Sequence, residues 1–124
     1  MTTFLRNNAE GAASGTSITT ANSADNSAGD ALDIATSGTR TYDNAWTHGG
    51  STSWKLEGTS GNTAILGWDR TNAKLAFRTY FQFTTTPGAT CNILQARHAS
   101  GGMAAVGMRT DGKLQVTDSA GAYI

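Results

Sequence analysis

Apolar and polar residues alternate along much of this chain, which is the pattern of β-strands. Within residues 53–57, apolar Trp54 and Leu56 are separated by charged Lys55 and followed by charged Glu57. A repeat of two residues is the period of a strand that buries one face. The segment at 39–43 is also strand-like, so we expect two strands joined by a loop that Gly49-Gly50 turns.

Beyond residue 38, turn-forming residues recur about every eight to twelve positions, a spacing typical of an antiparallel sandwich or barrel. No window has a sustained apolar stripe of helical period with capping signals, so almost no helix is expected. Strands are predicted at residues 4–6, 39–43, 53–58, 64–69, 75–84, 90–97, 104–110 and 113–118.

The strongest hairpin signal is the dipeptide Asp111-Gly112. A two-residue type I′ turn needs a positive φ at both central positions, and these residue types tolerate it. In the resulting hairpin, Val106 and Met108 are expected to face Leu114 and Val116.

The longest predicted strand, at 75–84, has two chemically different faces. One face carries Leu75, Phe77, Phe81 and Phe83. We expect this face in the core, because each buried Phe contributes about 1.5–3 kcal/mol.

The opposite face of that strand carries Arg78, Tyr80 and Gln82, which combine a planar cation, an aromatic ring and an amide. Such groups suit a sugar-binding surface. Gln95, Arg97 and Arg109 on neighbouring strands would extend it. The alternative is a solvated outer face without a ligand, where Arg and Gln are ordinary residents.

Residues 7–30 consist mainly of small and polar types, which is also the composition of a linker or a disordered tail. Two short runs oppose that interpretation, Ser17-Ile18-Thr19-Thr20 and Ala31-Leu32-Asp33-Ile34, because both favour β structure. With 124 residues and 38% hydrophobic content, the chain is expected to form one domain over 1–124, with a loop-rich N-terminal wrap at 7–38.

The charge balance limits the classes of partner that this chain is expected to bind. Nine basic and nine acidic residues cancel, so a nucleic-acid surface is not expected.

The chain opens without a basic, apolar leader or a bilayer-length segment, so neither a classical signal peptide nor membrane insertion is expected. Cys91 has no internal disulfide partner and is interpreted as a small buried hydrophobe.

Several segments together resemble the concanavalin-like or LamG-like jelly rolls of phage minor tail and fibre proteins, whose relatives include carbohydrate-binding modules and some polysaccharide lyases. They are Leu-Arg-Asn-Asn-Ala-Glu-Gly at 5–11, Gly-Asp-Ala-Leu-Asp at 29–33, His-Gly-Gly-Ser-Thr-Ser-Trp-Lys-Leu at 48–56, and Gly-Lys-Leu-Gln-Val at 112–116. The resemblance implies an all-β fold, an antiparallel β-sandwich of jelly-roll type.

The same resemblance implies a structural calcium ion, which such domains often hold with an early Glu and backbone carbonyls. Glu10 is the matching candidate, and Asp30 and Asp33 are secondary ones. Calcium takes six to eight oxygen ligands. The alternative is a solvated loop in which these acids bond to local backbone.

The chain is short for a closed jelly roll, so the expected sandwich is either part of a longer one or is completed by another chain. The first functional hypothesis is therefore a non-enzymatic virion structural protein of a tail, fibre or capsid surface. It would assemble with other virion proteins or with copies of itself. Outside a virion, an extracellular or cell-surface-facing location would be expected.

Two other hypotheses stay open. The second is a glycan-binding module that recognises a host-surface glycan through one sheet face. The third is a polysaccharide lyase, for which Tyr80, Gln82, Gln95, Arg97 and His98 are superficially suitable. In an unbroken strand, however, His98 falls on the opposite face from Gln95 and Arg97.

Overall fold

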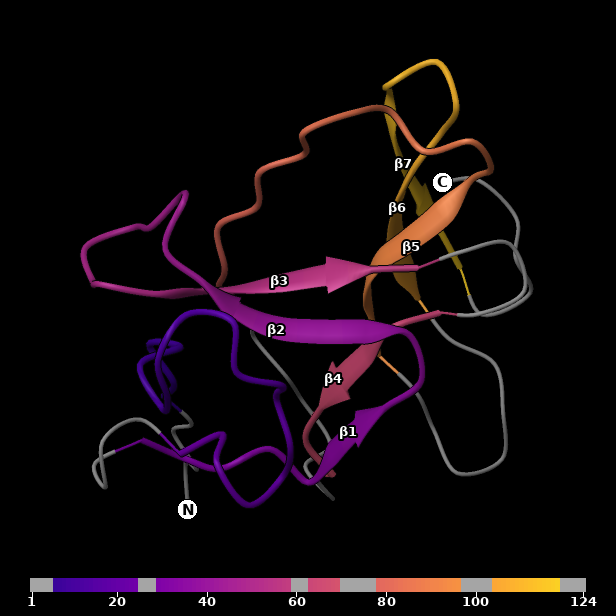
Figure 1. The fold of residues 1–124 in the computed structure, drawn as a ribbon. Helices are drawn as coiled ribbons and strands as arrows, with labels where there is room; N and C mark the ends of the chain where they lie inside the picture. Colours follow the sequence, from indigo (N-terminus) through magenta and orange to yellow (C-terminus); the bar gives the residue numbers. More distant parts are fainter. Residues whose placement is uncertain (1–5, 25–28, 59–62, 70–77, 97–103, 119–124) are drawn as a thin grey trace. The chain divides into compact units, whose positions relative to one another are not determined.

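The computed structural model describes residues 6–24, 29–58, 63–69, 78–96 and 104–118 (Figure 1). The described residues contain no helix, and their strands pair only in the antiparallel sense. The all-β prediction is confirmed. The strands are β1 (Ile34–Thr36), β2 (Thr39–Asp43), β3 (Ser53–Glu57), β4 (Ile65–Gly67), β5 (Cys91–Gln95), β6 (Ala105–Met108) and β7 (Leu114–Thr117).

The chain divides into two compact units, Met1–Arg78 and Thr79–Ile124. We call them the N-terminal unit and the C-terminal unit and describe each by itself. The expectation of one domain over residues 1–124 stays a prediction.

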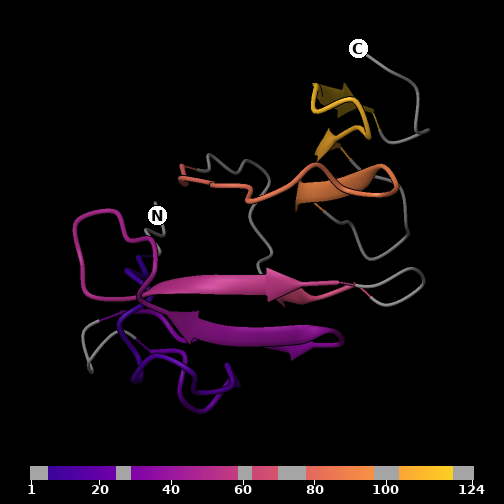
Figure 2. The same cartoon turned by 45° about the horizontal axis from the view of Figure 1, so that its top comes forward.

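In the N-terminal unit, β2 and β3 form the predicted hairpin, with Tyr42 opposite Trp54. Residues 6–24, which we call the N-terminal segment, include a stretch that lies along the edge of β2 opposite β3 (Figures 1 and 2). Ser17 forms a β-bridge with Thr41, and the Ile18 amide donates to the Arg40 carbonyl at 2.9 Å. Both edges of β2 are therefore paired. β1 and β4 form a separate two-stranded sheet. The alternation of apolar and polar residues did not predict a strand at the position of β1.

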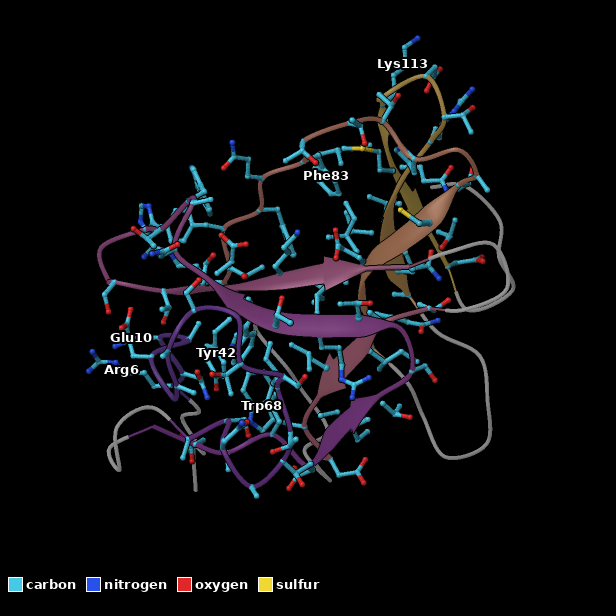
Figure 3. All side chains as sticks on the ribbon, viewed as in Figure 1. Arg6, Glu10, Tyr42, Trp68, Phe83 and Lys113 are labelled. Atoms are coloured by element: carbon cyan, nitrogen blue, oxygen red, sulfur yellow. The ribbon has the colours of Figure 1, made fainter. Side chains whose placement is uncertain are left out.

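The core of the N-terminal unit lies on β2. Ile18, Leu32 and Tyr42 are buried, and the partly buried residues packed against them are Ala12, Trp54, Leu66 and Trp68. The rings of Trp54 and Trp68 have centroids 6.2 Å apart. Figure 3 shows Tyr42 and Trp68 on the side of β2 that the N-terminal segment covers. Each fully buried large side chain contributes about 1.5–3 kcal/mol, so a few residues hold this small core.

Buried polar groups tie loops to that core. The Tyr42 hydroxyl donates to the Asn22 carbonyl at 2.8 Å. Ser23 is fully buried, and its hydroxyl accepts from the Leu32 amide at 2.8 Å and donates to the Thr20 carbonyl at 3.1 Å. The loops around residues 20 and 30 are thereby joined through one hydroxyl.

In the C-terminal unit, the strand order is β5-β6-β7. Val106 lies opposite Val116 and Met108 opposite Leu114, as predicted. The β5–β6 register shifts between Asn92 and Leu94, which marks a β-bulge in β5.

The turn of this hairpin differs from the prediction. The Gly112 amide donates to the Arg109 carbonyl at 3.0 Å, and the Arg109 amide donates to the Lys113 carbonyl at 2.9 Å. Only Gly112 among the loop residues has a positive φ, of 78°. This is a three-residue loop with a glycine bulge rather than a type I′ turn. The physical reason is the Asp111 carboxylate, which accepts from the Lys113 amide at 3.2 Å and favours the right-handed turn.

The predicted strand at 75–84 is wrong over its described part. Residues 78–84 form no strand, and Phe81 and Phe83 are 50% and 40% exposed rather than in the core. Residues 75–77 lie outside the described residues. Strand propensity is realised only against a pairing edge, and no described strand pairs with this segment. The predicted strand at 4–6 falls outside the described residues except for Arg6, which is not in a strand.

Substituting Gly11→Ala tests the packing of the N-terminal segment on β2. The new methyl group would collide with the Asn22 carbonyl and the Tyr42 hydroxyl, and would lie 2.8 Å from the Ala24 carbonyl. We expect a loss of about 1–3 kcal/mol in the free energy of unfolding, measured by urea denaturation. Gly88→Ala is the matched control, because its methyl group meets no atom within 4 Å. Equal effects of both substitutions would contradict this packing.

Candidate functional site

The carboxylate of Glu10 joins the N-terminal segment to the loop between β2 and β3. Its Oε1 accepts from the Ser51 amide at 2.7 Å and from the Thr52 amide at 3.0 Å, and its Oε2 accepts from the Ser51 hydroxyl. The Thr52 hydroxyl in turn donates to the Ala9 carbonyl at 2.5 Å. We call this arrangement the Glu10 latch; Figure 3 labels Glu10 in it.

Local backbone conformation places Glu10 for these contacts. Ala9 has the unusual φ of 64°, and its amide donates to the Asn7 side-chain oxygen at 2.8 Å. In the loop between β2 and β3, a Cβ on Gly50 would collide with Glu10 Oε1. Glycine at position 50 is therefore required for the close approach of the loop.

Donors surround the Glu10 carboxylate, and they lower its pKa from the ordinary value of 4.5. The largest cause is the hydrogen bond from the Ser51 side chain, followed by that from the Thr52 backbone; desolvation opposes them. Each of these bonds stabilises the charged form. The latch therefore favours an ionised Glu10.

The three acids that the resemblance implied for calcium each have backbone partners of their own in the structure. Glu10 faces N–H and O–H donors, whereas a cation requires oxygen acceptors. Asp30 Oδ2 accepts from the Arg6 amide at 2.9 Å, and Asp33 Oδ2 accepts from the Asp69 amide at 2.9 Å. The described residues hold no group of three or more His, Cys, Asp or Glu that could bind a metal. Each acid thus accepts from backbone amides, and the calcium assignment stays a prediction.

The residues predicted to bind glycan are not gathered on one strand. Tyr80 and Gln82 are exposed in the segment that forms no strand, and Arg78 belongs to the N-terminal unit. Gln95 ends β5, and Arg109 follows β6 and pairs with Asp111 at 3.3 Å. Arg97 and His98 lie outside the described residues. The glycan assignment stays a prediction.

The β5-β6-β7 sheet has one apolar and one polar face, because residues directly opposite in antiparallel strands share a face. The apolar face carries Cys91, Leu94, Val106, Met108, Leu114 and Val116. The other face carries Asn92, Gln95, Ala105, Gly107, Gln115 and Thr117.

Much of the apolar surface of the C-terminal unit is exposed. Met108 and Ala105 are buried, but Leu114 and Val116 on β7 are 65% and 45% exposed. In the segment that precedes β5, Tyr80 is 49% exposed, and Phe81 and Phe83 are also exposed. We call these five exposed residues the exposed apolar set. Large exposed apolar surface marks an interaction site when it is more than scattered single residues.

Comparison of the chain with protein-family models, with curated proteins and with solved structures finds no match. Within the described residues, no helix has the length and apolar character needed to cross a membrane.

Sequence reasoning singled out Glu10 and the His48-Gly49-Gly50-Ser51 segment but missed the contact between them. The available signal was weak: an acidic residue after small polar ones, and a Gly-Gly-Ser-Thr run directly before a strand. Backbone amides after glycine are accessible donors, but nothing in the pattern joins positions so distant in the chain.

Glu10→Gln tests the latch through its pH dependence. Because the folded pKa is lowered, the carboxylate stabilises the fold fully above about 4.5, and this contribution is lost as the pH falls through the folded pKa. We expect Glu10→Gln to lower the stability at pH 7, on the order of 1 kcal/mol. The difference from the parent should shrink at acid pH, as measured by urea denaturation between about pH 7 and pH 3.

Glu57→Gln is the control for this experiment, because Glu57 lies in an exposed pair with Lys55 at 3.1 Å. Exposed pairs contribute little. If the two variants shared one pH profile, the latch would not be a stabilising contact.

Proposed function

We propose that this chain is a non-enzymatic structural protein of a virion, in a tail, fibre or capsid surface, where it acts as a subunit of a larger assembly. The observation that carries this proposal is the exposed apolar set of the C-terminal unit. Burying such side chains is worth about 25 cal/mol per Å² of apolar surface, so contact with another chain would be favourable.

The dimensions of the sheets support the same proposal. The described strands form two-stranded and three-stranded sheets. A two-stranded sheet is marginal by itself and needs a third strand or a packed layer. We propose that they belong to a jelly-roll sandwich that another chain completes, either another virion protein or a copy of this one. The virion assignment itself is supported by the resemblance of the segments at 5–11, 29–33, 48–56 and 112–116 to phage tail and fibre jelly rolls.

The direct test is to ask where the chain is found. Particles purified on a density gradient from a culture that carries the gene should contain its tryptic peptides, in constant ratio to the other particle proteins across the peak. Recovery of the chain only from soluble fractions would overturn the virion assignment.

The second candidate is recognition of a host-surface glycan, supported by the half-exposed ring of Tyr80 between exposed Arg78 and Gln82. Tyr80→Ala should then weaken binding to immobilised glycans about tenfold or more, because an aromatic platform is lost. Phe83→Ala is the matched control, since it removes an exposed ring of the same unit. Undiminished binding by Tyr80→Ala would exclude this surface.

A further inference from the structure

β7 is an edge strand whose outward backbone groups can be identified. The Arg109 amide donates to the Lys113 carbonyl, so residue 113 directs its backbone toward the β6 side. Backbone direction alternates along a strand, and Gln115 and Thr117 therefore also face β6. Leu114 and Val116 direct their N–H and C=O groups to the other side, where no described strand pairs with β7. Both residues also have exposed side chains.

The two edges of this sheet differ in their protection. The β5 edge carries the bulge between Asn92 and Leu94, a device that discourages further pairing. The register of β7 against β6 runs without a shift. β7 has no proline, and no charged residue interrupts Leu114–Thr117. By the usual criteria, β7 is the edge open to another strand.

We propose that β7 pairs antiparallel with β7 of a second copy of this chain, about a two-fold axis at Gln115. The proposal rests on the proposed function as an assembly subunit and names the surface and the partner. In this register, Leu114 of one copy lies opposite Val116 of the other, and each Gln115 faces its equivalent. The outward N–H and C=O groups of Leu114 and Val116 bond to each other across the interface in both directions.

Alternative registers are less favourable. A shift by one residue would place Leu114 opposite Gln115 and join an apolar face to a polar one. A shift by two in one direction places Leu114 opposite Asp118, and in the other direction it places Val116 opposite Gly112 of the turn. Only the register centred on Gln115 continues the apolar face through both Leu114 and Val116.

Polar groups agree with this register. The amide nitrogen of Gln115 lies beside Gly107 on the polar face. A second Gln115 opposite would offer both an amide donor and an acceptor at this position. Lys113 opposes the uncharged Thr117 of the other copy, so no like charges face each other in this register. The formal net charge of zero adds no overall repulsion between copies.

The first experiment measures mass in solution by light scattering over a range of concentrations, with circular dichroism to confirm folding. The whole chain should be a dimer, and Val116→Lys should raise its dissociation constant at least about tenfold, because a charge enters the edge. Ile65→Lys is the matched control: it places the same charge on an exposed apolar strand residue outside the exposed apolar set and should leave the mass unchanged.

The second experiment tests the register directly. Gln115→Cys in a Cys91→Ala background should form an intermolecular disulfide on oxidation, since opposite residues of this kind have Cβ atoms about 4.5–5.5 Å apart. Lys113→Cys in the same background should not, because position 113 opposes position 117. The inference is overturned by a parent that stays monomeric, or by a dimer that Val116→Lys leaves intact and Gln115→Cys fails to cross-link.

These outcomes are separable from those of the proposed function. Self-association without a role for β7 would overturn this inference and leave the assembly proposal standing. Absence of the chain from particles would overturn the virion assignment while β7 pairing could still be observed.

Discussion

The N-terminal unit depends on the backbone hydrogen bonds between its N-terminal segment and the outer edge of β2. The Tyr42 amide donates to the Thr16 carbonyl, and the Gly15 and Ile18 amides donate to carbonyls of β2. This pairing brings Ile18 onto Tyr42 and places Gly11 directly against the Tyr42 hydroxyl. It also holds Glu10 within reach of Ser51. Core, polar contacts and latch all follow from one satisfied strand edge.

In the C-terminal unit, no described strand covers the outer edge of β7. The unit's central strand β6 is paired on both sides, and Met108 on the apolar face of this strand is buried. On β7, the side chains that continue the same apolar face are exposed. Among the described residues, backbone groups without a pairing strand and exposed apolar side chains thus occur on the same strand, which is the physical basis for expecting another chain there. In the N-terminal unit, the chain's own segment covers the outer edge of β2.

Residue types alone predicted part of the candidate site. Glu10 was identified as a candidate site residue, and the structure surrounds its carboxylate with donors from Ser51 and Thr52, which it anchors. Carboxylates bind both cations and backbone amides. The choice between them depends on which groups the fold brings near, and that information is not local in sequence.

Alternation and turn chemistry by themselves determined that the chain is all-β, the position of β2, the β2–β3 hairpin and the pairing of Val106 and Met108 with Val116 and Leu114. These features depend on neighbours a few residues apart, which side-chain period and glycine placement control directly. Tertiary structure alone decided that residues 78–84 form no strand and that residues 15–18 pair with β2. A strand needs a partner edge for its backbone hydrogen bonds, and the availability of that edge is settled only when distant segments meet.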